Sequence, residues 1–440
     1  MAGEVTMWDS SLLDALTENG SPITYGVVKP GAEGDVPFVR GGDITGGRVL
    51  INQLRTITRD ISQQYRRTLL RGGEILVSLV GNPGQIAIAP PSLVGANIAR
   101  QVGLIRLKPG VDSRFISYFL QSPVGQKTLG ARSLGSVQQV INLRDLKTVK
   151  VPLPPLPEQR RIAHILGTLD DKIENNRKTA KTLEAMAQAI FQSWFVDFDP
   201  VRAKMAGESP ESICKRLKLM PEILNLFPDQ LVDSELGEIP EGWRVGNLGN
   251  IAKNVRRTIS PSSIEQNTAY IALEHMPRQS VALHEWDIAD SVESNKFYFR
   301  KGEILFGKLR PYFHKVGIAS TDGICSTDIL VIIPKSTEWL GFSLGHISSK
   351  NLIDYANSGS TGTRMPRTNW NELAEYMVVI PTEQLAKKLN EIIQMQIEQI
   401  ISITHVNRSI KTLRDILLPK LISGEIRIQE AVKTTEEVLS

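Results

Sequence analysis

The chain has 440 residues, more than one ordinary hydrophobic core accommodates, and this length suggests two or three folded units. Apolar residues make up 41% and charged residues 22%, as in an ordinary globular protein, and no apolar run approaches the roughly 20 residues of a membrane span. The net charge of +4 is too small to indicate a nucleic-acid partner by itself. Composition therefore argues against a membrane protein and leaves function to local patterns.

The N-terminus lacks a basic segment followed by an apolar one, so we expect a cytoplasmic protein. The two cysteines, Cys214 and Cys325, lie far apart without CxxC spacing, which argues against a disulfide framework or a zinc site. Residues 1–156 then alternate short β-branched runs with turn residues such as Asn82-Pro-Gly. This pattern predicts a first compact domain of mixed strands and helices.

A long helix is predicted over residues 157–197, opening at Pro157 with a glutamate in its first turn. At about 1.5 Å per residue, such a helix measures roughly 60 Å. Its mainly apolar stripe alternates spacings of four and three, which is the period of a coiled-coil seam and requires a helical partner. The stripe consists of Ile162, Leu166, Leu169, Ile173, Asn176, Ala180, Leu183, Ala187, Ile190 and Trp194.

The second half of the chain follows the same plan. Residues 198–237, rich in Pro, Gly and acidic side chains, form a connector, and residues 238–381 form a second mixed domain. A distal helix covers 382–424, with Thr382 as its cap, before a C-terminal tail at 425–440. Its stripe, with one polar member, comprises Leu385, Leu389, Ile392, Ile400, Ile403, Asn407, Ile410, Leu413 and Leu417.

An internal repeat links the two halves. Arg71-Gly-Gly-Glu-Ile-Leu-Val returns as Arg300-Lys-Gly-Glu-Ile-Leu-Phe, and Val140-Ile-Asn-Leu-Arg-Asp-Leu returns as Arg367-Thr-Asn-Trp-Asn-Glu-Leu. Pro157-Glu-Gln is matched by Thr382-Glu-Gln. Three matches in the same order predict a duplication. We therefore expect an α+β protein in which two related domains are joined by two long antiparallel coiled-coil helices, with pseudo-two-fold symmetry.

Longer motifs carry a resemblance to a known family. Pro152-Leu-Pro-Pro-Leu-Pro-Glu-Gln-Arg-Arg-Ile-Ala is followed by Leu169-Asp-Asp-Lys-Ile-Glu-Asn-Asn and by Phe191-Gln-Ser-Trp-Phe-Val-Asp-Phe-Asp-Pro. With Gly237-Glu-Ile-Pro-Glu-Gly-Trp and Leu417-Leu-Pro-Lys-Leu-Ile-Ser-Gly-Glu-Ile, these strings resemble the specificity subunits of type I restriction-modification complexes over essentially the whole chain. The second helix departs from the first because only Val379-Ile-Pro-Thr-Glu-Gln precedes it.

The resemblance implies a non-catalytic DNA reader. Two target-recognition domains, residues 1–156 and 238–381, would each read one half of an interrupted double-stranded DNA sequence. The helices would set the spacing of the domains and recruit two methyltransferase subunits, with restriction subunits joining through the complex. S-adenosylmethionine, ATP and magnesium would belong to the partner subunits, so we expect no cofactor on this chain.

Catalytic motifs are missing from the sequence. There is no GxxxxGK[ST] phosphate loop, and Asn82-Pro-Gly-Gln lacks the second proline and the aromatic residue of an adenine-methyltransferase motif. The six histidines are scattered without HxxxH or HExxH spacing. We therefore predict no catalytic residue and no metal site.

Base readout needs paired hydrogen-bonding side chains on loops that reach the major groove. Two loops in each domain supply such side chains. In the first domain the candidates are Asn82, Gln85, Arg132, Ser133, Ser136, Gln138 and Gln139. In the second, where basic and aromatic residues alternate, they are Lys308, Arg310, Tyr312, His314, Lys315, Ser360, Thr361, Thr363, Arg364 and Arg367.

Three alternatives remain open at this point. The loops could be ordinary solvated turns with no role in binding. The chain could be a helical scaffold that assembles protein partners with only incidental affinity for nucleic acid, although the paired basic and aromatic loops argue against this. It could also be a free-standing DNA-modifying enzyme, which would need a cofactor or metal motif that the sequence does not show.

Overall fold

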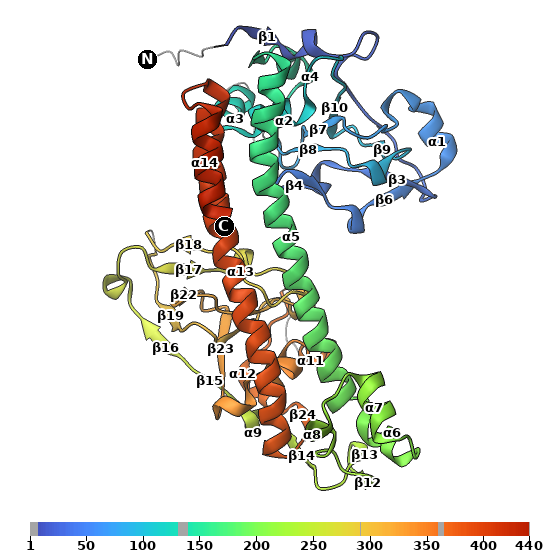
Figure 1. The fold of residues 1–440 in the computed structure, drawn as a ribbon, viewed down its shortest axis with the longest axis vertical. Helices are drawn as coiled ribbons and strands as arrows, with labels where there is room; N and C mark the ends of the chain where they lie inside the picture. Colours follow the sequence, from blue (N-terminus) through green and yellow to red (C-terminus); the bar gives the residue numbers. More distant parts are fainter. Residues whose placement is uncertain (1–7, 131–139, 291, 360–364, 440) are drawn as a thin grey trace. The chain divides into compact units, whose positions relative to one another are not determined.

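The computed structural model describes residues 8–130, 140–290, 292–359 and 365–439 (Figure 1). The chain divides into two compact units, Met1–Ile173 with Ser409–Ser440 and Glu174–Arg408. Two long helices, α5 (Leu156–Phe195) and α13 (Glu383–Ser423), contribute residues to both units. None of the helices in the described ranges contains an apolar stretch long enough to cross a membrane.

The first unit carries a four-stranded sheet, a three-stranded sheet, two strand pairs and the helices α1 to α4 beside its share of the long helices. One sheet has the order β2-β10-β7-β8 and the other the order β6-β3-β9. Strand β1 (Ser10–Leu12) pairs with β11 (Lys150–Pro152), which directly precedes α5. The remaining strands and α-helices before α5 are β2 (Thr24–Tyr25), β3 (Val36–Val39), β4 (Ile44–Thr45), β5 (Arg48–Val49), β6 (Arg55–Ile57), α1 (Arg59–Gln64), β7 (Ile75–Ser78), β8 (Ile86–Ile88), β9 (Asn97–Ile98), β10 (Val102–Ile105), α2 (Ser113–Gln121), α3 (Pro123–Gly130) and α4 (Leu143–Lys147).

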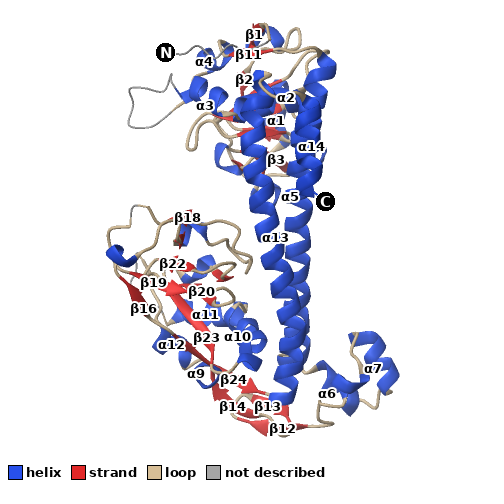
Figure 2. Ribbon diagram, turned by 60° about the vertical axis from the view of Figure 1, so that its left-hand side comes forward, coloured by secondary structure: helices blue, strands red, loops and turns tan. Residues whose placement is uncertain are grey.

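The second unit repeats this plan, with strands and helices interleaved as Figure 2 shows. Its four-stranded sheet has the order β15-β23-β20-β21, and its five-stranded sheet the order β16-β19-β22-β17-β18. Strand β14 (Arg244–Asn247) pairs with β24 (Met377–Ile380) just before α13. The other elements are α9 (Leu248–Ile251), β15 (Ala252–Asn254), β16 (Arg257–Ile259), β17 (Ala269–Ile271), β18 (Asp287–Ile288), β19 (Lys296–Phe299), β20 (Ile304–Gly307), β21 (Val316–Ile318), β22 (Gly323–Cys325), β23 (Ile329–Pro334), α10 (Leu340–Ile347), α11 (Lys350–Ser358) and α12 (Trp370–Ala374).

The central strands of both units are buried on both faces. In β7, Ile75 and Val77 join the core that includes the long helices, whereas Leu76 joins a separate core. In β20, Ile304 and Phe306 do the same, and Leu305 points to the other core. This is the two-residue alternation of a strand with two apolar faces. The matching sheet orders and helix sequence confirm the predicted fold class of two related domains joined by long helices.

The repeated Gly-Glu turn before each of these strands is built identically. The Arg71 amide donates to Glu74 Oε1 (2.6 Å), and the Arg300 amide donates to Glu303 Oε2 (2.9 Å). The glycine of each turn has a positive φ, 87° at Gly73 and 84° at Gly302, which L side chains rarely adopt. The shared motif is therefore a structural turn that starts the central strand.

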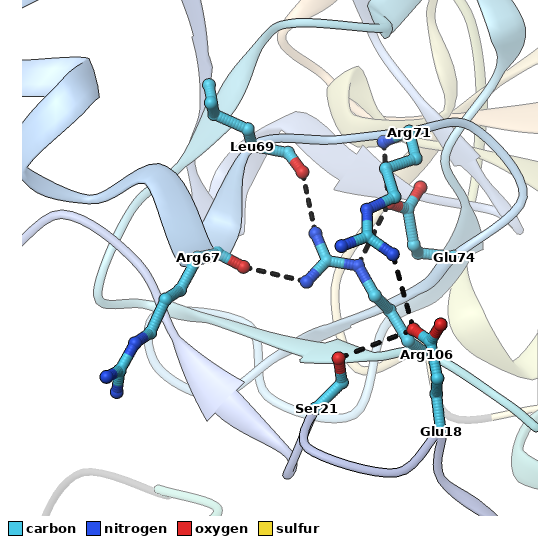
Figure 3. A network of polar contacts seen from close by, with 7 residues as sticks. All are labelled: Glu18, Ser21, Arg67, Leu69, Arg71, Glu74 and Arg106. Carbon is cyan, nitrogen blue, oxygen red and sulfur yellow. Dashed lines mark hydrogen bonds and ion pairs between the residues drawn. The ribbon is translucent and has the colours of Figure 1, made fainter.

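The carboxylates of the two turns have arginine partners from different elements. Figure 3 shows that Arg106, which follows β10, approaches Glu74 (Nε to Oε1, 3.4 Å) and donates to the carbonyl oxygens of Arg67 and Leu69. In the second unit, Arg257 of β16 forms two 2.7 Å bonds to Glu303. Both carboxylates lie largely inside the fold, where an unpaired charge would be costly. These arginines therefore stabilise the turns.

The connector between α5 and β14 is helical and packed. It contains α6 (Asp199–Met205), α7 (Pro210–Leu217), α8 (Pro221–Leu224) and the hairpin β12 (Leu231–Ser234) and β13 (Gly237–Pro240). Its apolar residues Val201, Ile213 and Ile223 are buried in the same core as Trp194 and Trp243. At the other end of the chain, α14 (Ile428–Leu439) packs Ala431 into the core of the first unit.

The two long helices pack together through the predicted stripes. In the second unit, Asn176 Nδ2 donates to Asn407 Oδ1 (2.8 Å), and Ala180 shares a buried cluster with Ile400. Later residues of α5 therefore contact earlier residues of α13, so the helices are antiparallel. In the first unit, Ile162, Leu166, Leu169 and Ile173 are buried with Ile410 and Leu417.

In the second unit, residues 280–286 are attached to both long helices by polar contacts. Glu184 of α5 is only 6% exposed and accepts hydrogen bonds from Ser280 Oγ (2.8 Å) and the Ala282 amide (2.9 Å). Arg408 of α13 lies 4.2 Å from the ring centre of Trp286 and donates to its carbonyl oxygen. Burial raises the pKa of Glu184 above its ordinary value, although the two donors oppose this shift.

This raised pKa gives a test of the attachment. Because the folded state holds the proton of Glu184 at higher pH than the unfolded chain, its stabilising contribution is complete below about pH 4.5 and is lost as pH rises through the folded pKa. Glu184→Gln keeps an acceptor for Ser280 and Ala282 but cannot ionise. We expect it to be at least as stable as wild type at pH 8, with a smaller advantage near pH 4.5.

The measurement is the thermal unfolding midpoint of both proteins across this pH range. Glu184→Ala is the control, because it removes the acceptor and should be destabilised at every pH by about 1–3 kcal/mol. A constant difference between wild type and Glu184→Gln across the range would contradict the proposed ionisation effect.

Candidate nucleic-acid interface

The two candidate segments of each domain lie side by side. In the first, the β7–β8 loop forms an isolated bridge between Val80 and Val140, and the Ile141 amide donates to the Leu79 carbonyl (3.0 Å). In the second, the β20–β21 loop forms the corresponding bridge between Leu309 and Arg367. Segments more than 50 residues apart in the sequence thus meet at the same place in both folds.

Several predicted contact residues lie outside the described residues, so the structure does not place their side chains. They belong to the segments that follow α3 and α11, directly before the bridged residues. They are Arg132, Ser133, Ser136, Gln138, Gln139, Ser360, Thr361, Thr363 and Arg364.

The first domain presents a small polar turn. Asn82 is exposed and sits between Gly81 and Gly84, whose positive φ values of 92° and 88° form the tight loop. Gln85 is half-buried, and its Oε1 accepts a hydrogen bond from the Gly46 amide (3.3 Å). Asn82 is thus open to a ligand, whereas Gln85 holds the loop against the neighbouring turn.

The second domain presents an aromatic turn. Residues Pro311–Phe313 form a short 3-10 turn between Arg310 (φ 51°) and His314 (φ 50°), two non-glycine residues with left-handed backbones. Such conformations cost on the order of 1–3 kcal/mol each and occur preferentially at functional sites. At the tip, the Tyr312 side chain is 49% exposed. The turn therefore holds an aromatic ring out toward solvent.

Two of the predicted cations point into the fold. His314 Nε2 lies 2.9 Å from the Ser348 carbonyl oxygen, and Lys315 Nζ donates to the Leu273 carbonyl oxygen. Burial lowers the pKa of both side chains. These contacts give both side chains a structural role, and the DNA contact predicted for them from the sequence stays a prediction. The charge periodicity of the loop could not distinguish inward from outward side chains.

The remaining cations form a basic edge around Asp328. Arg367 is 54% exposed and pairs with Asp328 (Nη2 to Oδ1, 3.0 Å). Lys308 is half-buried, and its pKa is lowered mainly by burial and further by Arg367 and Arg256. Arg310 is also half-buried, and among the described residues its Nε has no hydrogen-bond partner. A phosphate group at this edge would meet the donors of these three side chains and would compete with Asp328 for Arg367.

The structure adds a cation that sequence reasoning missed. Arg278 is exposed, and its Cζ lies 4.0 Å from the ring centre of Phe313 in the aromatic turn. It lies 35 positions before Phe313, so no local motif links the two residues. No cluster of metal-binding side chains is found within the described part of the chain.

The duplicated folds and their paired loops define a two-domain recognition protein, and comparisons with known proteins agree. Residues 24–185 match the family described as type I restriction modification DNA specificity domain. The type I restriction enzyme MjaIX specificity subunit of Methanocaldococcus jannaschii is 24% identical, with 90% of this chain and 88% of that protein covered. The Escherichia coli EcoBI specificity subunit is 31% identical over 47% of this chain and 44% of its own length.

A solved structure supports the fold. The type I restriction-modification S subunit from M. genitalium aligns with a TM-score of 0.53 and 16% identity, covering 96% of this chain and 97% of that chain. At this identity the likeness concerns the architecture alone. The sequence matches therefore show that residues 24–185 carry a type I restriction modification DNA specificity domain, and that the chain is similar over most of its length to specificity subunits of type I restriction enzymes.

The opposite orientations of two neighbouring loop residues predict opposite effects of mutation. Tyr312→Ala should leave the unfolding temperature unchanged, because surface substitutions rarely exceed 0.5 kcal/mol, and should weaken DNA binding about tenfold. His314→Ala should lower stability by about 1–2 kcal/mol through loss of the contact with Ser348. Thermal unfolding of both variants, and titration of each with double-stranded DNA, would separate the two effects. Equal loss of stability in both variants would refute the assignment.

Proposed function

We propose that the chain selects the sites at which a type I restriction-modification complex acts, each recognition fold reading one half of an interrupted DNA target. The observation that carries the proposal is the duplication of the bridged loop pair, Val80 with Val140 and Leu309 with Arg367. Two equivalent reading heads in one chain match a target in two parts. The chain itself supplies recognition, and the methylation of adenine belongs to its partners.

The chemistry of the loops suits double-stranded DNA. An amide such as that of Asn82 pairs with adenine through two hydrogen bonds in the major groove. Arginine and lysine side chains around Asp328 suit phosphate oxygens, which position a protein on the duplex without reading its sequence. Each fold would therefore combine phosphate contacts with a few base contacts. A cytoplasmic location is included in the proposal because cellular DNA is the substrate of the complex.

The outer face of α13 supports the assembly with methyltransferase subunits. Met395, Gln399, Ser402 and Val406 follow one another at spacings of four and three, and all four side chains are exposed and uncharged. Met395 is 65% exposed and Val406 39% exposed. A second heptad face of this kind suits packing against a helix of another protein. We propose that a methyltransferase subunit docks there, with S-adenosylmethionine, ATP and magnesium bound by the partner subunits.

The function is tested by mapping N6-methyladenine across the genome of a methylation-free host. The chain is expressed together with a type I methyltransferase subunit from the same source, and the methyltransferase alone serves as the control. A single interrupted motif that disappears in the control is expected. If the subunits are shown to associate and yet no methylation occurs, the proposal fails and the chain is better described as a scaffold.

The helices should set the gap between the half-sites. Seven residues inserted after Ile173 in α5 and after Arg408 in α13 preserve the heptad pattern and add about 10 Å, or about three base pairs. The methylated motif should then gain about three unspecified positions while both halves keep their bases. The same insertion after Gly207, in the connector, is the control and should leave the gap unchanged. An unchanged gap in the helix variant would show that the helices are not the ruler.

The docking face makes a separate prediction. Val406→Lys places a charge in the uncharged stripe and should weaken association with the methyltransferase by at least tenfold, because an unpaired charge would be buried at the interface. Gln394→Lys, on another exposed face of the same helix, should have little effect. Analytical ultracentrifugation of the mixed subunits measures both. Equal affinities for the two variants would place the methyltransferase elsewhere.

A further inference from the structure

The Arg278 side chain is exposed and stacked on an aromatic ring, as expected of a group held in place to contact a ligand. Its guanidinium carbon lies 4.0 Å from the ring centre of Phe313, and within the described residues no carboxylate or carbonyl oxygen binds its side chain. Stacking on an aromatic face restrains a guanidinium while leaving its N–H donors free at the edge. The neighbouring Lys315 is turned inward, whereas Arg278 is exposed.

The frame that carries this pair is stiff. The Gln279 amide, next to Arg278 in the chain, donates to the His314 carbonyl oxygen (2.9 Å), which joins the arginine segment to the aromatic turn. His314 is itself fixed by the Ser348 carbonyl oxygen. The Phe313 amide closes the turn by donating to the Arg310 carbonyl oxygen (2.9 Å). The ring and the guanidinium are therefore presented together rather than on two independent loops.

The first domain has the same segment without the cation. There a 3-10 turn begins where the Arg40 amide donates to Asp43 Oδ2 (2.8 Å). In the second domain the equivalent turn begins where the Ala272 amide donates to His275 Nδ1 (2.9 Å). At the same distance along the chain after Arg40 and Ala272 stand Gly46 and Arg278.

Both segments touch the hairpin loop of their own domain. Gly46 does so through its backbone, which donates to Gln85 Oε1 (3.3 Å), and Arg278 does so through its side chain on Phe313. The two domains thus share the backbone arrangement, but the side chains at Gly46 and Arg278 differ.

We propose that Arg278 reads a guanine in the half-site bound by the second domain, with Phe313 as its positioning residue. The inference rests on the proposed function. A guanidinium fork matches the O6 and N7 acceptors of guanine in the major groove, and this pairing is the commonest specific base contact of arginine. A phosphate contact would not require the restraint that Phe313 imposes. The first domain, with glycine at this position, makes no equivalent contact.

The test is methylation mapping of the complex with Arg278→Gln. The half-site of the second domain is identified first as the half whose recognition is weakened by Tyr312→Ala. We expect Arg278→Gln to lower the preference for guanine at one position of that half about tenfold or more, so that other bases are methylated there, while the other half keeps its bases. Arg244→Gln, an exposed arginine in β14 away from the loop, is the matched control and should leave the motif unchanged.

The role of Phe313 is tested by two further variants. Phe313→Leu removes the aromatic face and should relax the same guanine position as Arg278→Gln, whereas Phe313→Tyr keeps the ring and should retain the wild-type preference. A loss of stability alone would not relax a single base position. The pattern across variants therefore distinguishes positioning of Arg278 from a general structural role.

Three results would overturn the inference. The first is a half-site of the second domain that contains no guanine. The second is a uniform loss of methylation in Arg278→Gln with the motif unchanged, which indicates a phosphate contact. The third is an Arg278→Gln variant whose methylation and motif both equal those of wild type. In these cases the wild-type complex still produces an interrupted motif, so the proposed function stands. If the wild-type complex produces no such motif, the proposed function fails and the role of Arg278 fails with it.

Discussion

The structure depends on the burial of the apolar seam between α5 and α13. In each unit the seam is also part of the core of a recognition fold: Leu166 and Leu169 are buried with Phe115 and Phe119, and Phe191 is buried with Phe342 and Ile393. A helix of 40 residues has no stability of its own that could replace this burial. The recognition folds and the helices therefore stabilise each other, and neither is an independent module.

Polar groups within the seam help to fix the register of α5 against α13. In the pair of Asn176 and Asn407, the Asn407 Nδ2 group is buried and has no hydrogen-bond partner among the described residues, which costs stability. A polar residue at a core position is the best-attested means of fixing the register of paired helices. Arg414, which pairs with Asp170 (2.7 Å), plays a comparable role in the first unit. An error of register would displace the contacts that Glu184 makes with the recognition fold.

The sequence was sufficient for the features that depend on periodicity and repetition. The stripe from Ile162 to Trp194 predicts the buried face of α5 because a helix repeats its faces every three or four residues. The turns at Glu74 and Glu303 are predicted as equivalent because the same backbone geometry requires glycine and a carboxylate at the same positions. Such features are local, so their signals lie within one short segment.

The orientation of individual loop side chains was not predictable in this way. His314 and Tyr312 lie in the same basic and aromatic string, but the left-handed backbone at His314 directs its ring to Ser348, while Tyr312 remains exposed. The proximity of Arg278 and Phe313 depends on how two distant turns pack, and no local pattern encodes it. The arginine partners of the equivalent glutamates likewise come from different places in the fold, since Arg106 follows β10 and Arg257 lies in β16.

The residues of the frame and the residues of the loops are under different physical constraints. The turn carboxylates and the seam must be satisfied in both halves, because an unpaired buried charge or an open apolar face would cost several kilocalories per mole. The loop positions carry no such requirement, since Gly46 and Arg278 occupy equivalent places with no shared chemistry. Loop residues can therefore change without loss of the frame. A chain built in this way can acquire a new specificity in one half while the fold, the helices and the other half remain as they are.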